Sequence, residues 1–204
     1  ALDITDPASV ESAVDRIVNE TGRVDILVNN AGYGLMGAVE DVPMEQAQDQ
    51  FNVNLFGAAR LIQSVLPMMR QQHAGRIINV TSVDGKVAQP FGAWYVASKF
   101  ALEGLSDALR MELHPQGIHV AVIEPGAIQS EWADIAADHL QELSANGPYE
   151  KDASRAAAIL KAVKKFSSKP KVIARLVDQA ALSRRPKTRY SACLLYTSPS
   201  PRDA

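Results

Sequence analysis

Apolar runs that alternate with helical patterns set the strongest limit on how this chain can fold. Three runs rich in β-branched residues predict buried strands: VDILVNN (24–30), RIINVTS (76–82) and IHVAVIEPG (118–126). Amphipathic periodicity fills the intervals and predicts helices at 7–22, 43–70 and 92–113. Strands that alternate with helices indicate crossover connections, so the pattern predicts an α/β fold with a doubly wound parallel sheet covered on both faces.

The pattern loosens towards the carboxyl end of the chain. A partly helical flap, two further helices and the start of a last strand are predicted at 127–149, 151–166, 170–183 and 187–192. The tail CLLYTSPSPRDA does not continue that strand, and when it is read back into codons it resembles a sequencing-library adapter. We therefore predict one domain over 1–192 and a non-native tail over 193–204, with a genuine disordered tail as the alternative.

Composition and charge exclude several classes of protein. The 204 residues are 47% hydrophobic and 22% charged, which is typical of a globular domain, and no window is apolar enough to predict a membrane span. The segment 151–190 holds 12 basic and 2 acidic residues, so it is a candidate nucleic-acid surface. Its basic residues recur at helical intervals without interleaved aromatics, which favours a solvated helix face and no nucleic-acid partner. The histidines lack metal-ligand spacing, and Cys193 has no partner, so no metal site is expected.

Polar and small residues follow each of the three predicted strands. NNAG (29–32), Ser82 and the Pro-Gly of EPG (124–126) stand at the carboxyl ends, where ligands bind in doubly wound sheets. Tyr95 and Lys99 are four residues apart in the following helical pattern, so they share one face of that helix. The three strand ends and this helix are expected to converge on one crevice.

Taken in order, NNAG, the N-V-N of FNVNLFGA, Ser82, Y-V-A-S-K and the P-G of EPGAIQS resemble the short-chain dehydrogenase/reductase family, over residues 1 to about 192. The run NNAGYGLMGAVEDVP is most similar to bacterial relatives of hydroxysteroid and retinol dehydrogenases. The resemblance implies a Rossmann-like fold, a cytoplasmic oxidoreductase, NAD or NADP as cofactor, and hydride transfer between that cofactor and an alcohol or ketone.

The resemblance also implies four catalytic residues. Tyr95 would be the general acid/base, and Lys99 would favour its phenolate and bind the nicotinamide ribose. Ser82 would hydrogen-bond the substrate oxygen, and Asn54 would hold a water of the proton relay behind Lys99. Taken alone, Ser82 is equally explained as a strand-end hydroxyl and Asn54 as a helix-surface amide.

Cofactor contacts are carried over from the same motifs. Asp3 and Ile4 would flank the adenine, although Asp3 could instead be a helix N-terminal carboxylate. The adenosine ribose would be contacted by Asn30, Ala31 and Gly32. The nicotinamide and its ribose would be contacted by Tyr95, Lys99, Pro125, Gly126 and Ile128. The family's Gly-rich phosphate turn is not in this sequence, so we expect an N-terminally truncated fold that is poorly soluble and inactive by itself.

Apolar side chains suggest the substrate and the assembly. Apolar side chains in the flap and in the segment before Tyr95 predict that the substrate is an apolar alcohol or ketone. The alternative is that these side chains only pack the flap against the rest of the chain. The residues concerned are Phe91, Trp94, Ile128, Trp132, Ile135 and Leu140. The helices at 43–70 and 92–113 are apolar on more than one face, and the resemblance implies that they pair in a homo-oligomer. A non-catalytic dinucleotide sensor or scaffold is the alternative function.

Overall fold

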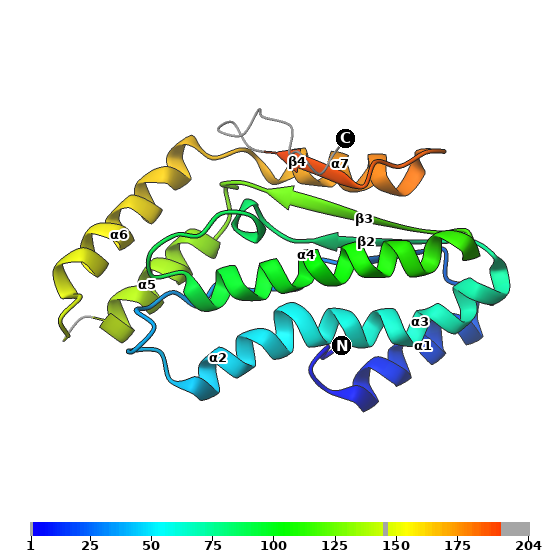
Figure 1. Ribbon diagram of the computed structural model, residues 1–204, viewed down its shortest axis with the longest axis horizontal. Helices are drawn as coiled ribbons and strands as arrows, with labels where there is room; N and C mark the ends of the chain where they lie inside the picture. Colours follow the sequence, from blue (N-terminus) through cyan, green and yellow to red (C-terminus); the bar gives the residue numbers. More distant parts are fainter. Residues whose placement is uncertain (1, 145–146, 193–204) are drawn as a thin grey trace.

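A parallel sheet of four strands forms the centre of the computed structural model, which describes residues 2–144 and 147–192 (Figure 1). The strands run in the order β1 (Ile26–Asn29), β2 (Gly75–Val80), β3 (Ile118–Pro125) and β4 (Arg189–Ala192). All three pairings are parallel. The four predicted strands and the α/β class are therefore confirmed, whereas the tail at 193–204 lies outside the described residues.

Three helices cover one face of the sheet. They are α1 (Pro7–Thr21), α3 (Ala58–Gln72) and α4 (Ala93–Leu113). Their apolar stripes meet the strands in one core, in which Met69 of α3, Ile77 of β2 and Val120 of β3 are almost fully buried. Asp6 caps the start of α1, where its carboxylate accepts a hydrogen bond from the Ala8 amide, and Gly22 caps the end. Capping and periodicity thus explain why this segment is helical.

The opposite face of the sheet is covered by α7 (Pro170–Leu182). Its Ala180 packs with Ile78 of β2 and Ile123 of β3 in a second core. Over β1 the same face is open, because Ile26 and Val28 are 41% and 39% exposed. Helices therefore cover both faces of the sheet, as predicted. On this face α7 covers β2 to β4, and few described residues lie over β1.

The flap is a helical pair. Helices α5 (Trp132–Ser144) and α6 (Glu150–Val163) pack through small residues, with Leu140 of α5 fully buried between them. Leu140 therefore packs the flap, which was the alternative to a role in substrate binding, whereas Ile135 is 47% exposed. Lys161 and Lys164 form ion pairs with Asp138 and Asp134 of α5, so part of the basic charge of this region is balanced inside the pair.

The helix predicted at 43–70 is interrupted. It consists of α2 (Met44–Phe51), a π-helical turn at Asn52–Gly57 and α3. π-helical turns inside α-helices occur frequently at functional sites, because the extra residue re-aims neighbouring side chains. Hydrophobic periodicity could not have revealed this turn, since it shifts the register by only one residue.

Candidate active site

A cavity of about 880 Å³ lies at the carboxyl ends of the strands, where the sequence predicted a crevice. It is lined by Asn30 and Gly32 after β1, by Ser82 after β2 and by Gly126 after β3, together with Tyr95 and Lys99 of α4. The three strand ends and the α4 pair therefore do converge.

Tyr95 and Lys99 are buried side by side, each with only 6% of its surface exposed. The Lys99 ammonium lies 5.8 Å from the centre of the Tyr95 ring and donates a hydrogen bond to the Val80 carbonyl at 3.1 Å. The Trp132 ring covers the phenol from the flap, with 5.2 Å between ring centres. The phenol itself is thus largely removed from solvent.

Burial dominates the protonation of this pair. It raises the pKa of the Tyr95 phenol well above its usual value of 10, against the opposing effect of the adjacent Ser82 hydroxyl. Burial also lowers the pKa of Lys99 to about 8. We expected Lys99 to favour the phenolate, but the pKa of Tyr95 shifts in the opposite direction, because desolvation disfavours the charged form of each side chain.

Ser82 ends β2 and begins the short turn η2 (Val83–Gly85). Its hydroxyl accepts a hydrogen bond from the Asp84 amide at 3.1 Å, and its side chain is buried against Tyr95. A hydroxyl at this place can still donate its own proton to an oxygen in the cavity.

Asn54 occupies the π-helical turn and is almost fully buried, which excludes the helix-surface alternative. Its amide exchanges hydrogen bonds with the backbone of Tyr33 at 3.0 Å and donates to Ser98, whose hydroxyl bonds the Tyr95 carbonyl. Asn54 therefore ties the loop after β1 to α4. Whether it also holds a relay water stays a prediction.

The predicted cofactor residues divide into two groups. Those that line the cavity are Asn30, Gly32, Tyr95, Lys99, Pro125, Gly126 and Ile128. Ala31, Asp3 and Ile4 are not among the described lining residues. The Asp3 carboxylate bonds the backbone and hydroxyl of Thr5, and the Ile4 side chain packs on Gly57. Their contact with an adenine remains a prediction.

Among the polar residues at the site that were not predicted from the sequence are Asp84, Gln89 and Glu103. Asp84 and Gln89 line the cavity, and Glu103 accepts a hydrogen bond from Thr81 just behind it. Glu103 follows Lys99 by four residues, so helical spacing could have revealed it. Asp84 and Gln89 lie in an irregular segment that carries no such periodicity.

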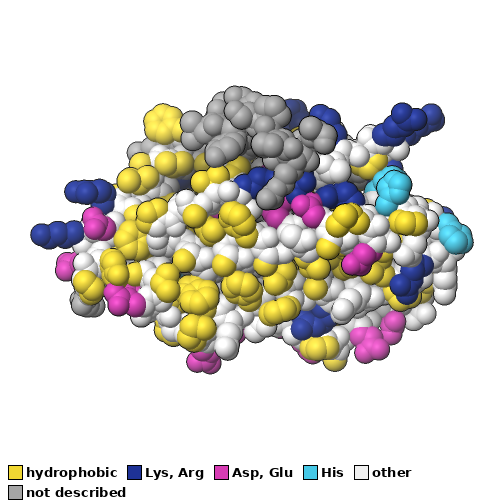
Figure 2. Space-filling view, viewed as in Figure 1, with side chains coloured by type: hydrophobic (Ala, Val, Ile, Leu, Met, Phe, Trp, Pro, Cys, Tyr) yellow, Lys and Arg dark blue, Asp and Glu magenta, His cyan; other side chains and the backbone are white. Residues whose placement is uncertain are grey.

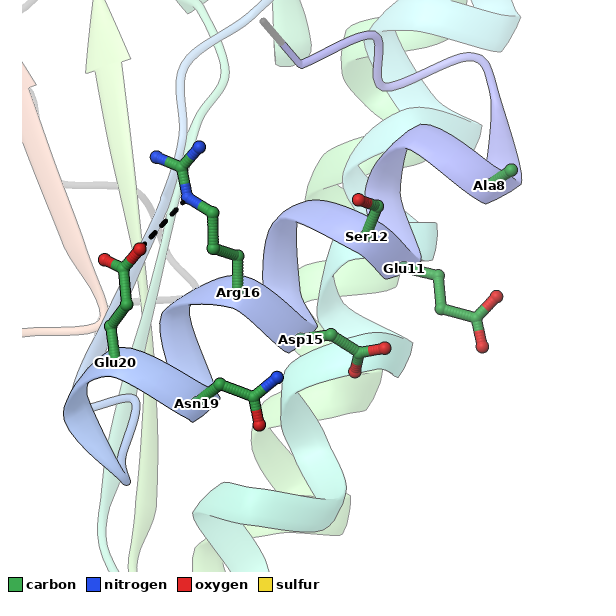
Figure 3. A pocket seen from close by; sticks show the side chains of 7 residues that line it. All are labelled: Ala8, Glu11, Ser12, Asp15, Arg16, Asn19 and Glu20. Atoms are coloured by element: carbon green, nitrogen blue, oxygen red, sulfur yellow. Dashed lines mark ion pairs between the residues drawn. The ribbon is translucent and has the colours of Figure 1, made fainter.

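A second hollow lies on the outer surface of α1 and has no part in this site. Figure 3 shows its side chains projecting from successive turns of one helix, with an ion pair of 3.4 Å between Arg16 and Glu20. Both of these side chains are largely exposed. A shallow polar face of this kind is ordinary helix surface.

Sequence comparisons define the class of protein. Residues 1–141 match the short chain dehydrogenase family. The chain is 43% identical over 133 residues to a 3-ketodihydrosphingosine reductase of Bacteroides thetaiotaomicron, which covers 65% of this chain and 49% of that protein. It is 35% identical over 191 residues to an uncharacterized oxidoreductase of Schizosaccharomyces pombe, and this match covers 93% of this chain and 78% of that protein. The chain belongs to the short-chain dehydrogenase/reductase family, and spans about half the length of the first of these relatives.

Solved structures agree with this assignment. A short-chain dehydrogenase from Streptomyces avermitilis superposes with a TM-score of 0.79 at 29% identity, over 94% of this chain and 68% of that one. A short-chain dehydrogenase/reductase from Burkholderia phymatum in complex with NAD superposes with a TM-score of 0.78 at 26% identity, over 93% of this chain and 68% of that one. An NAD+-bound xylitol dehydrogenase superposes with a TM-score of 0.75 at 26% identity, over 93% of this chain and 75% of that one. The Rossmann-type fold is therefore shared.

Two features are absent from the described part of the chain. No helix there is long and apolar enough to cross a membrane. No group of three or more His, Cys, Asp or Glu side chains in residues 2–144 and 147–192 is arranged to hold a metal ion.

Proposed function

We propose that this chain is the catalytic part of an NAD- or NADP-dependent oxidoreductase that interconverts an alcohol and a ketone, with Tyr95 as general acid/base. The observation that carries the proposal is the gathering of Tyr95, Lys99 and Ser82 around one cavity at three strand ends, with Asn54 behind them. Similarity to two NAD-bound structures supports the cofactor class.

The residues present fit a nicotinamide ring and its ribose. A Cβ on Gly32 would lie 3.0 Å from the Asn54 amide oxygen and 3.5 Å from the Lys99 ammonium, so only glycine leaves this part of the cavity open. The Lys99 ammonium has one protein acceptor in the described chain and two further donors for ribose hydroxyls. Gly126 and Ile128 offer a backbone and an apolar wall for the ring. The bound cofactor would donate or accept the hydride.

The side chains would then handle the proton. During ketone reduction, the Tyr95 hydroxyl donates its proton to the substrate oxygen as hydride reaches the carbon, so the C=O bond becomes CH–OH. Ser82 hydrogen-bonds the same oxygen and stabilises its negative charge. Because the phenol keeps its proton at neutral pH, it is ready to act as the acid. Lys99, with a pKa of about 8, is suited to return a proton to Tyr95.

The cavity walls favour an apolar substrate. Of the apolar side chains singled out in the sequence, Ile128 and Trp132 line the cavity, together with Leu160 and Val163 of α6. One relative is named a ketone reductase, which agrees with a carbonyl substrate. We also propose that a preceding βα segment completes the cofactor site, supported by the open edge of β1 and by the partial coverage of the first relative.

A homo-oligomer through the segments 43–70 and 92–113 is part of the proposal. Phe56 and Phe100 are 50% and 45% exposed, and Met111 is 73% exposed. Figure 2 shows hydrophobic side chains spread along the face that carries α4. An exposed apolar face of this kind marks a protein–protein contact.

The test uses the chain together with the coding sequence that precedes it, here called the extended protein. NADH or NADPH oxidation is followed with a panel of apolar ketones, and cofactor binding is measured by fluorescence. We expect turnover that falls at least a thousandfold in Tyr95→Phe while cofactor binding persists. Binding without turnover of any ketone would instead support a sensor or scaffold, and loss of binding would remove the cofactor assignment.

A further inference from the structure

Phe91 has a backbone conformation that is rare for its residue type. Its φ of 63° lies in the left-handed region, which is strained for a bulky side chain and persists only where surrounding contacts hold it. In the described chain one other residue that is not glycine has a positive φ, and this is His73 at the end of α3, where left-handed residues are common. Phe91 instead stands four residues before Tyr95, just ahead of α4. Strain of this kind gathers at functional sites.

The backbone at Phe91 is tied to the loop after β1. The Phe91 carbonyl accepts a hydrogen bond from the Gly37 amide at 2.8 Å, and the Gly92 carbonyl accepts one from Val96 in the first turn of α4 at 2.8 Å. Gly92 also packs closely, because a Cβ at this position would lie 3.3 Å from Cε of Met36. The left-handed turn at Phe91 therefore fixes where α4 begins relative to that loop.

The Phe91 ring packs against the flap, whose two helices lie at the end of the molecule where α4 begins (Figure 1). It is half-buried and contacts the cluster that Met36 forms with buried residues of α5 and α6. It also meets the Tyr149 ring, just before α6, with 6.2 Å between ring centres and 81° between planes, an edge-to-face arrangement that favours aromatic pairs. Trp132 packs against the same cluster and covers Tyr95. One cluster therefore joins Phe91 to the side chain that covers the phenol.

We propose that Phe91 is a positioning residue: its left-handed backbone directs the ring to the flap and so holds Trp132 over Tyr95, which shapes the apolar part of the substrate site. Phe91 is not among the described residues that line the cavity, so it acts through the flap and not by touching the substrate. Glycine would adopt this φ without strain but would carry no ring, so packing on the flap is what a phenylalanine supplies here. The inference rests on the proposed function of the same site, because it concerns how that site binds its substrate.

The experiment measures the reduction of an apolar ketone by variants of the extended protein. Phe91→Gly relieves the backbone strain and removes the ring, so KM should rise at least about tenfold while kcat changes less than about threefold. Phe91→Tyr keeps the ring and should restore KM to within about threefold of the unchanged protein. His73→Gly is the matched control, because it relieves an exposed left-handed residue at the opposite end of β2 from the cavity. It should leave both constants unchanged.

A double variant shows whether Phe91 acts through Trp132. Trp132→Ala alone should also raise KM, and the addition of Phe91→Gly should change KM by less than about twofold further. If Phe91→Gly does not fold, it is replaced by Phe91→Leu, which keeps an apolar side chain without the ring and should raise KM at least about threefold. An unchanged KM, a loss confined to kcat, an equal effect of His73→Gly, or full additivity with Trp132→Ala would each overturn the inference while the oxidoreductase assignment stands.

The fluorescence of Trp132 decides the inference if no ketone is reduced and the proposed function fails. The difference between spectra of proteins with and without Trp132→Phe isolates this emission. In Phe91→Gly, or in Phe91→Leu if that variant replaces it, we expect emission at longer wavelength and stronger quenching by acrylamide, because Trp132 becomes more exposed to water. Phe91→Tyr and His73→Gly should show neither change. Emission that the loss of the ring leaves unaltered, or that His73→Gly alters as much, overturns the inference.

Discussion

The Thr81 hydroxyl donates a hydrogen bond to Oε1 of the Glu103 carboxylate, with 2.6 Å between the oxygens. Thr81 stands between Val80, whose carbonyl accepts from Lys99, and Ser82. Glu103 follows Lys99 by one turn of α4. The η2 turn also closes over this side chain, because a Cβ on Gly85 would lie 2.9 Å from Glu103 Cγ. One carboxylate thus fixes the end of β2 relative to α4.

The other oxygen of Glu103 extends this link to the last strand. It accepts a hydrogen bond from the Arg189 guanidinium of β4 at 3.0 Å, and Arg189 also pairs with Asp107 at 2.7 Å and with Glu124 at 3.3 Å. The Arg189 side chain is only 9% exposed, so its positive charge depends on these partners. Helix α4 and the last strand of the described sheet are therefore joined through one ionic cluster.

Glu103→Gln is expected to disturb both the site and the fold. Burial lowers the pKa of Lys99, and the charge of Glu103 partly restores it. Without that charge the pKa of Lys99 falls further below about 8, so the limb of the kcat/KM profile that reports Lys99 should move to lower pH. Because Arg189 loses one buried partner, the free energy of unfolding should fall by about 2 to 4 kcal/mol. Steady-state rates across pH and urea unfolding of the extended protein measure the two effects.

Asp107→Asn is the control for this variant. It removes another carboxylate from Arg189 but has no contact with Thr81 among the described residues. We expect it to lower stability and to leave the pH profile in place. If both variants moved the profile equally, Glu103 would be only a structural partner of Arg189.

Gly34 sets the distance between the loop after β1 and the flap. A Cβ at this position would lie 2.3 Å from Cζ2 of Trp132, the residue that covers Tyr95. Gly34→Ala should therefore push Trp132 away from the cavity and raise KM about tenfold with a smaller change in kcat. In the double variant Gly34→Ala with Trp132→Ala, the alanine at 34 should add little to the effect of Trp132→Ala alone. Additive losses would show that the two residues act separately.

The ionisation of Asp84 predicts a pH dependence of stability. Its carboxyl titrates near pH 6 in the folded chain and has an ordinary value of 3.8, because burial disfavours the charged form. Between these values the folded state holds the proton that the unfolded state has lost, so stability falls as pH rises from about 4 to 6. Asp84→Asn should remove this fall, about 1 to 2 kcal/mol after solvent screening of the partly exposed group. Urea unfolding midpoints of the unchanged protein and of Asp84→Asn, measured over this pH range, give the difference in stability. A difference that rises with pH would contradict the prediction.

Periodicity and strand-end residues were enough to predict the parallel sheet, the helices and the convergence of Ser82, Tyr95 and Lys99. Those features follow from local spacing, since the carboxyl ends of parallel strands share one edge. The pKa of Tyr95 was mispredicted because burial depends on the whole fold, including Trp132 from a distant helix. The partners of Arg189 were likewise hidden, since Glu103 and Arg189 are 86 residues apart in sequence.

The exposed apolar side chains of α4 give the last prediction. Phe100 and Met111 are eleven residues apart, which places them about 20° apart around a helix of 3.6 residues per turn, so they form one stripe. If this stripe joins two subunits, Phe100→Glu should bury a charge at the contact and raise the dissociation constant of the dimer at least a hundredfold, about 2.7 kcal/mol. Leu182→Glu is the matched control, because Leu182 is 77% exposed at the end of α7. Light scattering with size-exclusion chromatography of the extended protein measures the mass of each variant, and a Phe100→Glu protein as dimeric as the control would remove α4 from the interface.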